Sequence, residues 1–563
     1  MRFNPWFPLA CIVLTASLGS IWFLLPFTEE IPLDDGYIHF VYGTHLADTG
    51  RLFFNTPDER GVGATSLLWV WLLAGGRLLG LPIPIAAKIY GIVSLIAVGY
   101  GVFLLFCDAI GHALALLAAW LVVFSGNMLW FSLSGMETSL FLALGIWSLL
   151  AYRKGRFFTL GIGLGFLALT RPEGLLLAPS LFWADYWVKR RFLRGLLLSG
   201  LLALLVCAPW FIYLYWRTGH FIPTSGLGKQ MSMDVGLHAI LERNDSLKIL
   251  GLFPGLLYPV VWLFYLAEFA LGGVALPAPH LPIGLIVDNR SYSFSVWAVI
   301  GLALVVFPLL RSFSRYSQHS IPGLSPNFNR APKLAFWLWV ILHNLSYMVF
   351  LPFPGTSSRY GAINHVALWI ALVIGLGVWC NRSRRETQQV SVWPASQFVG
   401  LASGLIVIAV ASTMYWNGVY DANIDFMQNV RLRSALYLRE RMPSPEKCAA
   451  FDIGVLRYFG GQPVVDLGGL LNSDLPTRFS QGKMDTYLIE QKVTCLVLPG
   501  YSSTSEKGWF DFAEELGISS SDILDLKLIQ TFEISEDRWL QGYLATNNYQ
   551  ASVEIYRLLP TTR

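Results

Sequence analysis

The chain has 563 residues, of which 54% are hydrophobic and 13% are charged, with a formal net charge of +4 at pH 7. Soluble domains carry about 25% charged residues, so this composition, with a mean hydropathy of +0.52, excludes an ordinary soluble protein. It predicts a polytopic α-helical membrane protein. The aromatic content of 14% suits the Trp and Tyr belts found at membrane interfaces.

Apolar runs that match the length of a membrane crossing recur through the first 415 residues. A crossing helix needs about 20 apolar residues. The predicted spans are 7–27, 83–106, 111–130, 137–152, 157–171, 172–188, 195–216, 293–310, 334–351, 361–380 and 397–415. This gives about eleven spans, within a range of 10 to 13.

Four basic clusters indicate the orientation in the membrane. They lie at 153–156, 189–191, 311–333 and 381–385. With eleven spans, all four fall on the same side as the N-terminus, as the positive-inside rule requires. The apolar runs 64–81 and 249–275 are interpreted as interfacial or re-entrant; if both cross instead, there are about thirteen spans. Either count predicts a multi-pass cell-membrane protein with a cytoplasmic N-terminus and an extracytoplasmic C-terminal region.

The composition changes sharply after Trp416. Residues 416–563 contain 19 acidic residues and 14 Lys or Arg, a net charge of −5, which leaves +9 for the preceding part. The pattern predicts a helix at 427–441, strands at 448–452 and 463–466, a helix at 484–491, and strands at 494–499 and 552–559. We therefore expect a transmembrane domain over 1–415 and an extracytoplasmic α/β domain over 416–563. Cys448 and Cys495 lie in predicted strands, where a disulfide is chemically allowed.

Polar islands interrupt the apolar pattern at the predicted outer ends of the spans. They are the Asp34-Asp35 loop with His39, Ser134-Gly-Met-Glu137-Thr138, Thr170-Arg171-Pro172-Glu173-Gly174, and Ser358-Arg359-Tyr360 followed by His365. A further outer loop, Pro223-Thr-Ser-Gly-Leu-Gly-Lys229, ends in a cation. Ionisable groups beside hydrocarbon are costly and usually functional.

Each island also has a purely structural interpretation. Asp35 can cap a helix that Gly50 ends. Ser134 with Glu137, and Thr170 with Glu173, have the spacing of capping boxes. The cations in the outer loops can reach lipid headgroups. The convergence of acids and arginines on one membrane face favours a functional site over a set of independent caps.

Taken in order, the motifs resemble the GT-C superfamily of glycosyltransferases. The segments are Leu33-Asp-Asp-Gly-Tyr-Ile, Gly63-Ala-Thr-Ser-Leu-Leu-Trp69, Ser134-Gly-Met-Glu-Thr138, Leu169-Thr-Arg-Pro-Glu-Gly174 and Ser358-Arg-Tyr360. They are similar to the branch with mycobacterial-type arabinofuranosyltransferases and mannosyltransferase-like proteins. Asp452-Ile-Gly454 and Pro463-Val-Val-Asp-Leu-Gly468 resemble the outer domain of that branch. Gly36 and Val62-Gly-Ala-Thr-Ser66 depart from its usual residues, which leaves the acceptor open.

The resemblance implies inverting transfer of a hexose or pentose from a polyprenyl-phosphate donor to a lipid, glycan or protein acceptor of the cell envelope, without a nucleic-acid partner. An Asp of the first outer loop would be the general base, with Asp35 favoured over Asp34. Three roles stay open for the second Asp: to orient the first, to bind the acceptor, or to hold a divalent cation such as Mg or Mn together with its neighbour. Arg359, Lys229 and Arg171, in that order, are expected to bind the donor phosphate.

Five further residues are candidates for substrate binding. They are Glu137, Glu173, His365, Tyr360 and His39. Two other classes of function remain open: a transporter or lipid flippase, and a non-catalytic glycan-binding relative. The charges cluster at the outer ends of spans rather than near mid-span, and a large outer domain is unusual for a small-solute carrier. Both features favour the transferase.

Overall fold

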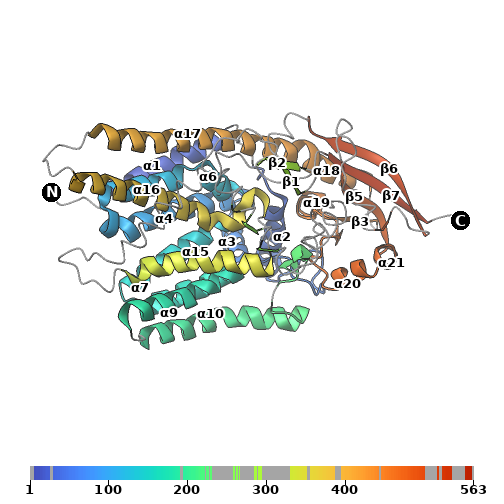
Figure 1. The fold of residues 1–563 in the computed structure, drawn as a ribbon. Helices are drawn as coiled ribbons and strands as arrows, with labels where there is room; N and C mark the ends of the chain where they lie inside the picture. Colours follow the sequence, from blue (N-terminus) through green and yellow to red (C-terminus); the bar gives the residue numbers. More distant parts are fainter. Residues whose placement is uncertain are drawn as a thin grey trace.

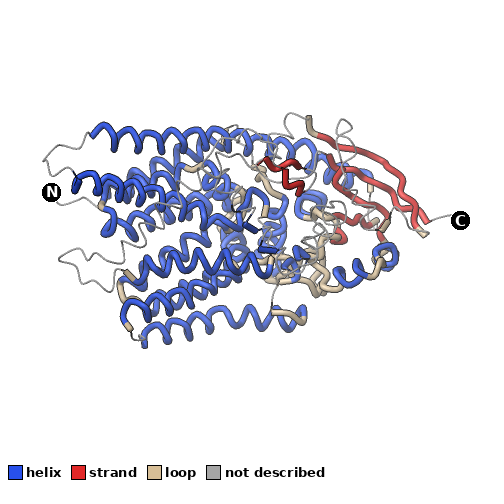
Figure 2. Tube along the Cα trace, in the orientation of Figure 1, coloured by secondary structure: helices blue, strands red, loops and turns tan. Residues whose placement is uncertain are grey.

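The computed structural model consists of a helical bundle and a smaller domain built on a β-sheet (Figure 1). Figure 2 shows the long strands gathered at one end of the molecule, with the helices filling the other. The chain begins at the bundle end far from the sheet and finishes beside the sheet. The structure describes residues 6–25, 29–190, 194–221, 223–226, 228–230, 258–259, 262–263, 266, 284–287, 290–293, 330–351, 355–386, 395–442, 446–500, 517–518, 523–535 and 552–560.

The bundle is made of α-helices with two short 3-10 turns. Its first half holds α1 (Trp6–Phe23), α2 (Asp34–Thr49), α3 (Leu67–Leu78), α4 (Ile83–Ile110), α5 (His112–Phe124), α6 (Gly126–Leu133), α7 (Thr138–Arg153) and α8 (Phe157–Thr170). The rest holds η1 (Pro172–Leu176), α9 (Leu177–Lys189), α10 (Arg194–Thr218), α15 (Ala331–Phe350), η2 (Thr356–Gly361), α16 (Ala362–Glu386) and α17 (Ala395–Phe426).

Several of these helices are long and apolar enough to cross a membrane. They are α1, α4, α10, α15, a helix over Thr356–Gly377 and a helix over Ala402–Arg441. α3, α7 and α8 are shorter apolar helices. The 12 residues of α3 fall well below the length of a crossing, which fits an interfacial segment. The polytopic helical fold is thus confirmed. Most of the predicted span 293–310 and of the apolar run 249–275 lies outside the described residues.

The predicted span 111–130 is a bent pair of helices rather than one straight helix. α5 and α6 meet at an angle of 54°. Ser125 between them has an extended backbone, with φ −63° and ψ 129°, so it breaks the helical hydrogen-bond pattern. Gly126 follows at a close crossing, because a Cβ there would lie 2.6 Å from the Ser412 carbonyl oxygen of α17.

Small residues let the helices of the bundle approach closely. A Cβ at Gly91 of α4 would lie 1.7 Å from the carbonyl oxygen of Ser132 in α6. A Cβ at Gly145 of α7 would lie 2.2 Å from the ring of Trp339 in α15, which is fully buried. Close packing at small residues is the usual source of helix association in a bilayer, where apolar burial adds little.

The last helix of the bundle continues into the sheet domain without a break. α17 is followed directly by the π-helical turn η3 (Met427–Leu432) and by α18 (Arg433–Arg441). The predicted helix 427–441 is therefore confirmed as the end of a longer helix. The change of composition at Trp416 falls inside α17, and the domain boundary drawn there stays a prediction.

The sheet of the outer domain has the strand order β4-β3-β5-β7-β6. The strands are β3 (Lys447–Ala450), β4 (Val464–Asp466), β5 (Val493–Gly500), β6 (Leu524–Glu533) and β7 (Ser552–Pro560). β3 pairs in parallel with β4 and β5, and β7 pairs antiparallel with β5 and β6. The helices α19 (Gly454–Gly460), α20 (Leu475–Ser480) and α21 (Met484–Glu490) supply the crossovers that parallel strands require. A separate antiparallel hairpin joins β1 (Gly284–Val287) and β2 (Arg290–Ser293).

The predicted strands and the predicted helix 484–491 of the outer domain agree with the observed elements to within two residues at each end, whereas the helix predicted at 427–441 begins much earlier, as part of α17. α19, α20 and β6 are additional. β6 alternates apolar and polar residues over Leu524–Leu528, which is the pattern of a strand, although its residues are mostly exposed or half-buried.

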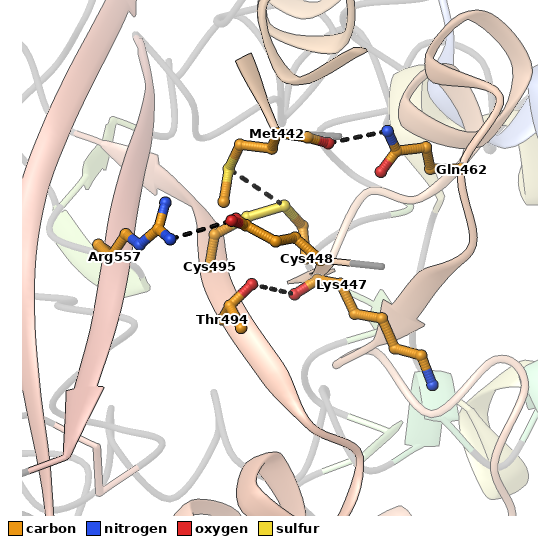
Figure 3. The surroundings of a disulfide bond; sticks show 8 residues. Met442, Lys447, Cys448, Gln462, Thr494, Cys495 and Arg557 are labelled. Carbon is orange, nitrogen blue, oxygen red and sulfur yellow. Dashed lines mark hydrogen bonds and ion pairs between the residues drawn. A yellow bond between two sulfur atoms is a disulfide. The ribbon is translucent and has the colours of Figure 1, made fainter. Parts of the chain in front are cut away.

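Cys448 and Cys495 form a disulfide between β3 and β5 (Figure 3). The two residues are directly opposite in the parallel register, with their Cα atoms 4.5 Å apart, a distance that disulfides adopt. The Met442 sulfur lies 3.9 Å from the Cys448 sulfur, as Figure 3 shows. The pairing that the sequence allowed is therefore made.

Loss of this disulfide should destabilise the outer domain. The bond joins residues separated by 47 positions, for which the chain-entropy model gives about 4 kcal/mol as an upper figure. We expect the Cys448→Ala/Cys495→Ala variant of the intact protein to unfold several degrees lower in a fluorescence-monitored melt. Reductant should lower the Tm of the wild type and leave that of the double variant unchanged. Equal melting of oxidised and reduced wild type would contradict the prediction.

Candidate active site

The Asp34-Asp35 pair opens α2, a helix that lies between the bundle and the outer domain (Figure 1). Leu33 before it has an extended backbone, and Gly50 ends the helix in a left-handed conformation at φ 71°. Acids in the first turn of a helix are favoured by the helix dipole. The prediction that Asp35 is an N-cap is wrong, because Leu33 holds that position. Successive helical residues point about 100° apart, so the two carboxylates face different surroundings.

The Asp35 carboxylate is held by two cations from distant parts of the chain. Arg359 donates from Nη2 to Oδ2 of Asp35, and Lys229 Nζ lies 3.9 Å from the same oxygen. Burial alone would raise the pKa of Asp35, but the charges of Arg359 and Lys229 outweigh it and lower the pKa to about 2. The Asp35 side chain keeps 28% of its surface exposed. It is thus an ionised acceptor within reach of a ligand.

Tyr360 is the centre of a cluster of three cations. The guanidinium carbons of Arg171 and Arg359 lie 4.6 and 4.9 Å from its ring centroid, and Lys229 Nζ lies 5.1 Å from it. Lys229 also donates to the Tyr360 hydroxyl, and Arg359 Nη2 does so at 3.3 Å. The ring face attracts each cation, so Tyr360 keeps three like charges close together. The predicted donor-phosphate residues are therefore neighbours in space.

Arg359 is almost completely buried, with 1% of its surface exposed. Nη2 contacts Asp35, whereas Nε and Nη1 have no hydrogen-bond partner among the residues that the structure describes. Buried guanidinium donors are strongly favoured to pair. These two nitrogens therefore mark a place where an anion or polar ligand would be bound.

The turn that presents Arg359 is strained. Ser357 and Ser358 both have left-handed backbones, with φ 59° and 57°. Non-glycine residues adopt this conformation at a cost of about 1–3 kcal/mol each, and such positions gather at functional sites. The strain turns the Arg359 side chain into the protein instead of toward lipid, contrary to the structural interpretation of an interfacial cation.

Three carboxylates balance the three cations. Arg171 Nε lies 2.8 Å from Glu137 and Nη1 lies 3.6 Å from Glu173, while Tyr347 donates to Glu173 at 2.8 Å. With Asp35, the cluster has three formal positive and three formal negative charges. Arg171 pairs with both glutamates, so its guanidinium is less available to a ligand than that of Arg359.

The proposed capping boxes are not formed. The Ser134 hydroxyl donates to the Phe131 carbonyl at 2.8 Å, and the Thr170 hydroxyl donates to the Phe166 carbonyl at 2.8 Å. Each hydroxyl thus turns back onto the helix before it, because α6 and α8 end there. This releases Glu137 and Glu173 to pair with Arg171.

The two histidines occupy different places. His39 lies one turn after Asp35 in α2 and donates from Nδ1 to the Asp35 carbonyl at 3.1 Å. Its Nε2 is buried with no hydrogen-bond partner in the described part of the chain. His365 lies in α16, buried, with its ring 5.6 Å from that of Phe131. His39 supports the site backbone directly, and a substrate contact at His365 stays a prediction.

Asp34 faces the outer domain rather than the three cations around Tyr360. Its carboxylate accepts hydrogen bonds from the backbone N–H groups of Gly454 at 2.9 Å and Val455 at 2.8 Å, at the start of α19. Arg431 Nη1 lies 3.8 Å from it, and Arg431 Nη2 pairs with Asp452 at 2.6 Å. Burial raises the pKa of Asp34 to about 6 against the pull of Arg431. A Cβ at Gly454 would lie 2.3 Å from the Asp34 carbonyl oxygen, so this contact requires glycine.

Asn55 makes a second joint between the first outer loop and the outer domain. Its side-chain amide donates to the Val464 carbonyl at 2.9 Å and accepts from the Val464 N–H at 3.0 Å. The amide therefore occupies the edge of β4 as a neighbouring strand would. Arg431, Asp452 and Asn55 were not among the predicted site residues. The Asp452-Ile-Gly454 motif was the available signal for the contact with Asp34.

A divalent cation at the Asp pair, one of the roles left open by the sequence, does not fit this arrangement. In the described ranges, no group of three or more His, Cys, Asp and Glu side chains is placed to hold a metal ion. The Asp34 carboxylate is taken up by two backbone amides, and the Asp35 carboxylate by two cations. Cations at a carboxylate disfavour a further cation there, so the two carboxylates as arranged here do not form a metal site.

Comparisons with solved structures agree with this architecture. AglB, an oligosaccharyltransferase from Archaeoglobus fulgidus solved with an inhibitory peptide and a dolichol-phosphate, matches 89% of this chain and 70% of its own, at 14% identity and a TM-score of 0.52. ArnT from Cupriavidus metallidurans, solved with undecaprenyl phosphate, matches 97% of both chains, at 12% identity and a TM-score of 0.52. The chain has the GT-C fold. The GT-C fold expected from the motifs is therefore confirmed over nearly the whole chain.

Sequence comparisons add one local match. Residues 422–555 match a family model described as "Domain of unknown function (DUF8728)". This range covers most of the outer domain that follows the GT-C helices. A search of curated protein sequences finds no match.

The different surroundings of the two aspartates can be tested by amide hydrogen exchange. Asp34→Ala removes the acceptor of the Gly454 and Val455 N–H groups, and one lost buried hydrogen bond is worth about 1–3 kcal/mol. We expect exchange at these two amides in the detergent-solubilised protein to accelerate by about one to two orders of magnitude. Asp35→Ala is the matched control and should leave both amides protected. Equal acceleration in the two variants would contradict the assignment.

Proposed function

We propose that this protein is an inverting glycosyltransferase. It moves a hexose or pentose from a polyprenyl-phosphate donor to a lipid, glycan or protein acceptor of the cell envelope. The GT-C fold supports transfer from a lipid-linked donor, since AglB and ArnT were solved with dolichol-phosphate and undecaprenyl phosphate. The observation that carries the proposal is Arg359, a buried guanidinium that contacts the half-buried Asp35 carboxylate and retains two donors without partners in the described structure.

In this proposal Asp35 is the general base. It accepts the proton of the acceptor hydroxyl while the hydroxyl oxygen bonds to the anomeric carbon. The bond from that carbon to the phosphate oxygen breaks, and polyprenyl phosphate leaves with the electron pair. The acceptor hydroxyl and the phosphate lie on opposite faces of the sugar, so the configuration inverts.

Arg359 and Lys229 would bind the phosphate, with Arg171 contributing charge from behind Tyr360. Planar guanidinium donors match phosphate oxygens in pairs, and fixed cations stabilise the leaving group as its charge develops. When phosphate neutralises Arg359 and Lys229, their hold on Asp35 weakens and the pKa of that carboxyl rises. Donor binding therefore makes Asp35 a stronger base. Glu137, Glu173, His365 and His39 are proposed to bind substrate hydroxyls or to orient these groups.

The reaction would take place on the extracytoplasmic side. The basic clusters between the predicted spans lie on the same side as the N-terminus, and the positive-inside rule makes that side the cytoplasm. The Cys448–Cys495 disulfide supports an oxidising compartment for the outer domain. The site lies against that domain, through Asp34 and α19. The protein is thus proposed to be a multi-pass cell-membrane enzyme with an outer catalytic face.

Turnover with defined donors tests the proposal. Purified protein is incubated with short-chain polyprenyl-phosphate sugars, hexosyl and pentosyl, and release of polyprenyl phosphate is followed. Asp35→Asn should lose about two to four orders of magnitude in turnover, the range for removal of a general base. Asp48→Asn, at an exposed position of the same helix, is the control and should keep full rate.

The outcomes separate the proposed enzyme from the alternatives. A donor consumed equally by wild type and Asp35→Asn would contradict the assignment of the base. Donor binding without turnover in wild type, unchanged in both Asp35→Asn and Asp34→Asn, would indicate a carrier or a glycan-binding protein instead.

The pH dependence tests the link between Arg359 and Asp35. The pKa of Asp35 is lowered to about 2, so the base stays ionised above about pH 4 and loss of rate through its protonation occurs only below that. Arg359→Gln removes the main lowering cause while burial remains, so the pKa should rise by about one unit or more. The acid limb of kcat/KM should move to higher pH by that amount. Arg77→Gln, which breaks an exposed ion pair with Asp48, should not shift it.

A further inference from the structure

A loop of the outer domain reaches the segment that carries Lys229. This loop, 467–472, lies between β4 and α20. At Gly228, next to Lys229, a Cβ would lie 2.2 Å from the carbonyl oxygen of Gly468 and 2.7 Å from the carbonyl carbon of Gly469. The two backbones are therefore in direct contact.

The same loop also touches the first outer loop. A Cβ at Gly61 would lie 1.6 Å from the Leu471 carbonyl oxygen. The Thr224 hydroxyl donates to the Leu470 carbonyl and accepts from the Val62 N–H at 3.1 Å. The outer-domain loop thus lies between residues 61–63 on one side and residues 223–226 and 228–230 on the other. These contacts join three distant parts of the chain beside Lys229.

Asp466 fixes the shape of the loop. One carboxylate oxygen accepts from the Gly468 N–H at 2.8 Å, and the other accepts from the Leu471 N–H at 2.8 Å. The side chain is 2% exposed. Both oxygens are thus used to bend 467–471 toward the bundle, and a side chain with a single acceptor oxygen cannot replace them.

We propose that Asp466 is a positioning residue for the donor-phosphate site, acting through 467–471 and Gly228 on Lys229. Lys229 reaches Tyr360 and Asp35 from a segment that contacts the outer domain through Gly228. The outer domain therefore completes the site instead of merely covering it. This inference rests on the proposed function in one respect, that Lys229 binds the phosphate of the donor.

A double-mutant cycle on the full-length protein tests whether Asp466 acts on donor binding through Lys229. Binding of undecaprenyl phosphate is measured for wild type, Asp466→Asn, Lys229→Ala and the double variant. Asp466→Asn should weaken binding about tenfold, and by less than about twofold when Lys229 is already Ala, because residues acting through one another are not additive. An equal loss in both backgrounds would show a general structural effect and overturn the proposal. Asp485→Asn, a half-buried position at the start of α21 in the same domain, should bind as wild type does.

A second measurement needs no ligand. The rate at which an amine reagent labels Lys229 is followed by mass spectrometry, with Lys483 as an internal reference. Asp466→Asn should raise the labelling of Lys229 several-fold relative to Lys483, and Thr224→Val should do so more weakly. If Asp466→Asn does not fold, Thr224→Val alone decides. Unchanged labelling overturns the positioning role, whereas failure of wild type to bind undecaprenyl phosphate with altered labelling overturns only the proposed function.

Discussion

The hydrogen bonds from the Gly454 and Val455 amides to Asp34 join the helical bundle to the outer domain beside the candidate site. They connect residues 420 and 421 positions apart in the chain. Because Asp34 and Asp35 are neighbours in α2, anchoring the first also orients the second toward Arg359. The helix that opens with both acids is thus fixed from the outer domain on one side and from the bundle on the other. The Asp34-Asp35 motif thereby joins the two parts of the chain and also supplies the carboxylate that we propose as the general base.

The cluster around Tyr360 is stable because its charges are matched. Arg171, Lys229 and Arg359 would repel one another in a buried setting, but an aromatic face and three carboxylates lie among them. The three cations differ in how many of their donors already pair with a carboxylate. Arg171 is committed to two glutamates, whereas Arg359 gives one nitrogen to Asp35. A ligand phosphate would therefore meet Arg359 at little cost to the rest of the network.

The sequence predicted the bundle, most strands of the outer domain and the gathering of Asp35, Arg359 and Arg171, since apolar runs and short polar motifs are local signals. It did not predict which partner each acid takes. The spacing of Ser134 and Glu137 fits a capping box, yet the hydroxyl turns back and Glu137 meets Arg171 from another helix. Likewise the pairing of Asp34 with Arg431 depends on how η3 meets α19. Such contacts arise from tertiary packing, and a capping pattern contains no information about which distant residues will pack together.

The helix that runs unbroken from Ala395 to Arg441 gives the molecule a mechanical property. At about 1.5 Å per residue it is roughly 70 Å long, more than twice the hydrocarbon thickness of a bilayer. Its first part is embedded and its last part carries Arg431 into the outer domain. A span changes its tilt when bilayer thickness changes. In a helix of this length a small change of tilt displaces the far end by a larger distance. The position of the outer domain relative to the candidate site should therefore depend on the thickness of the bilayer around this last helix.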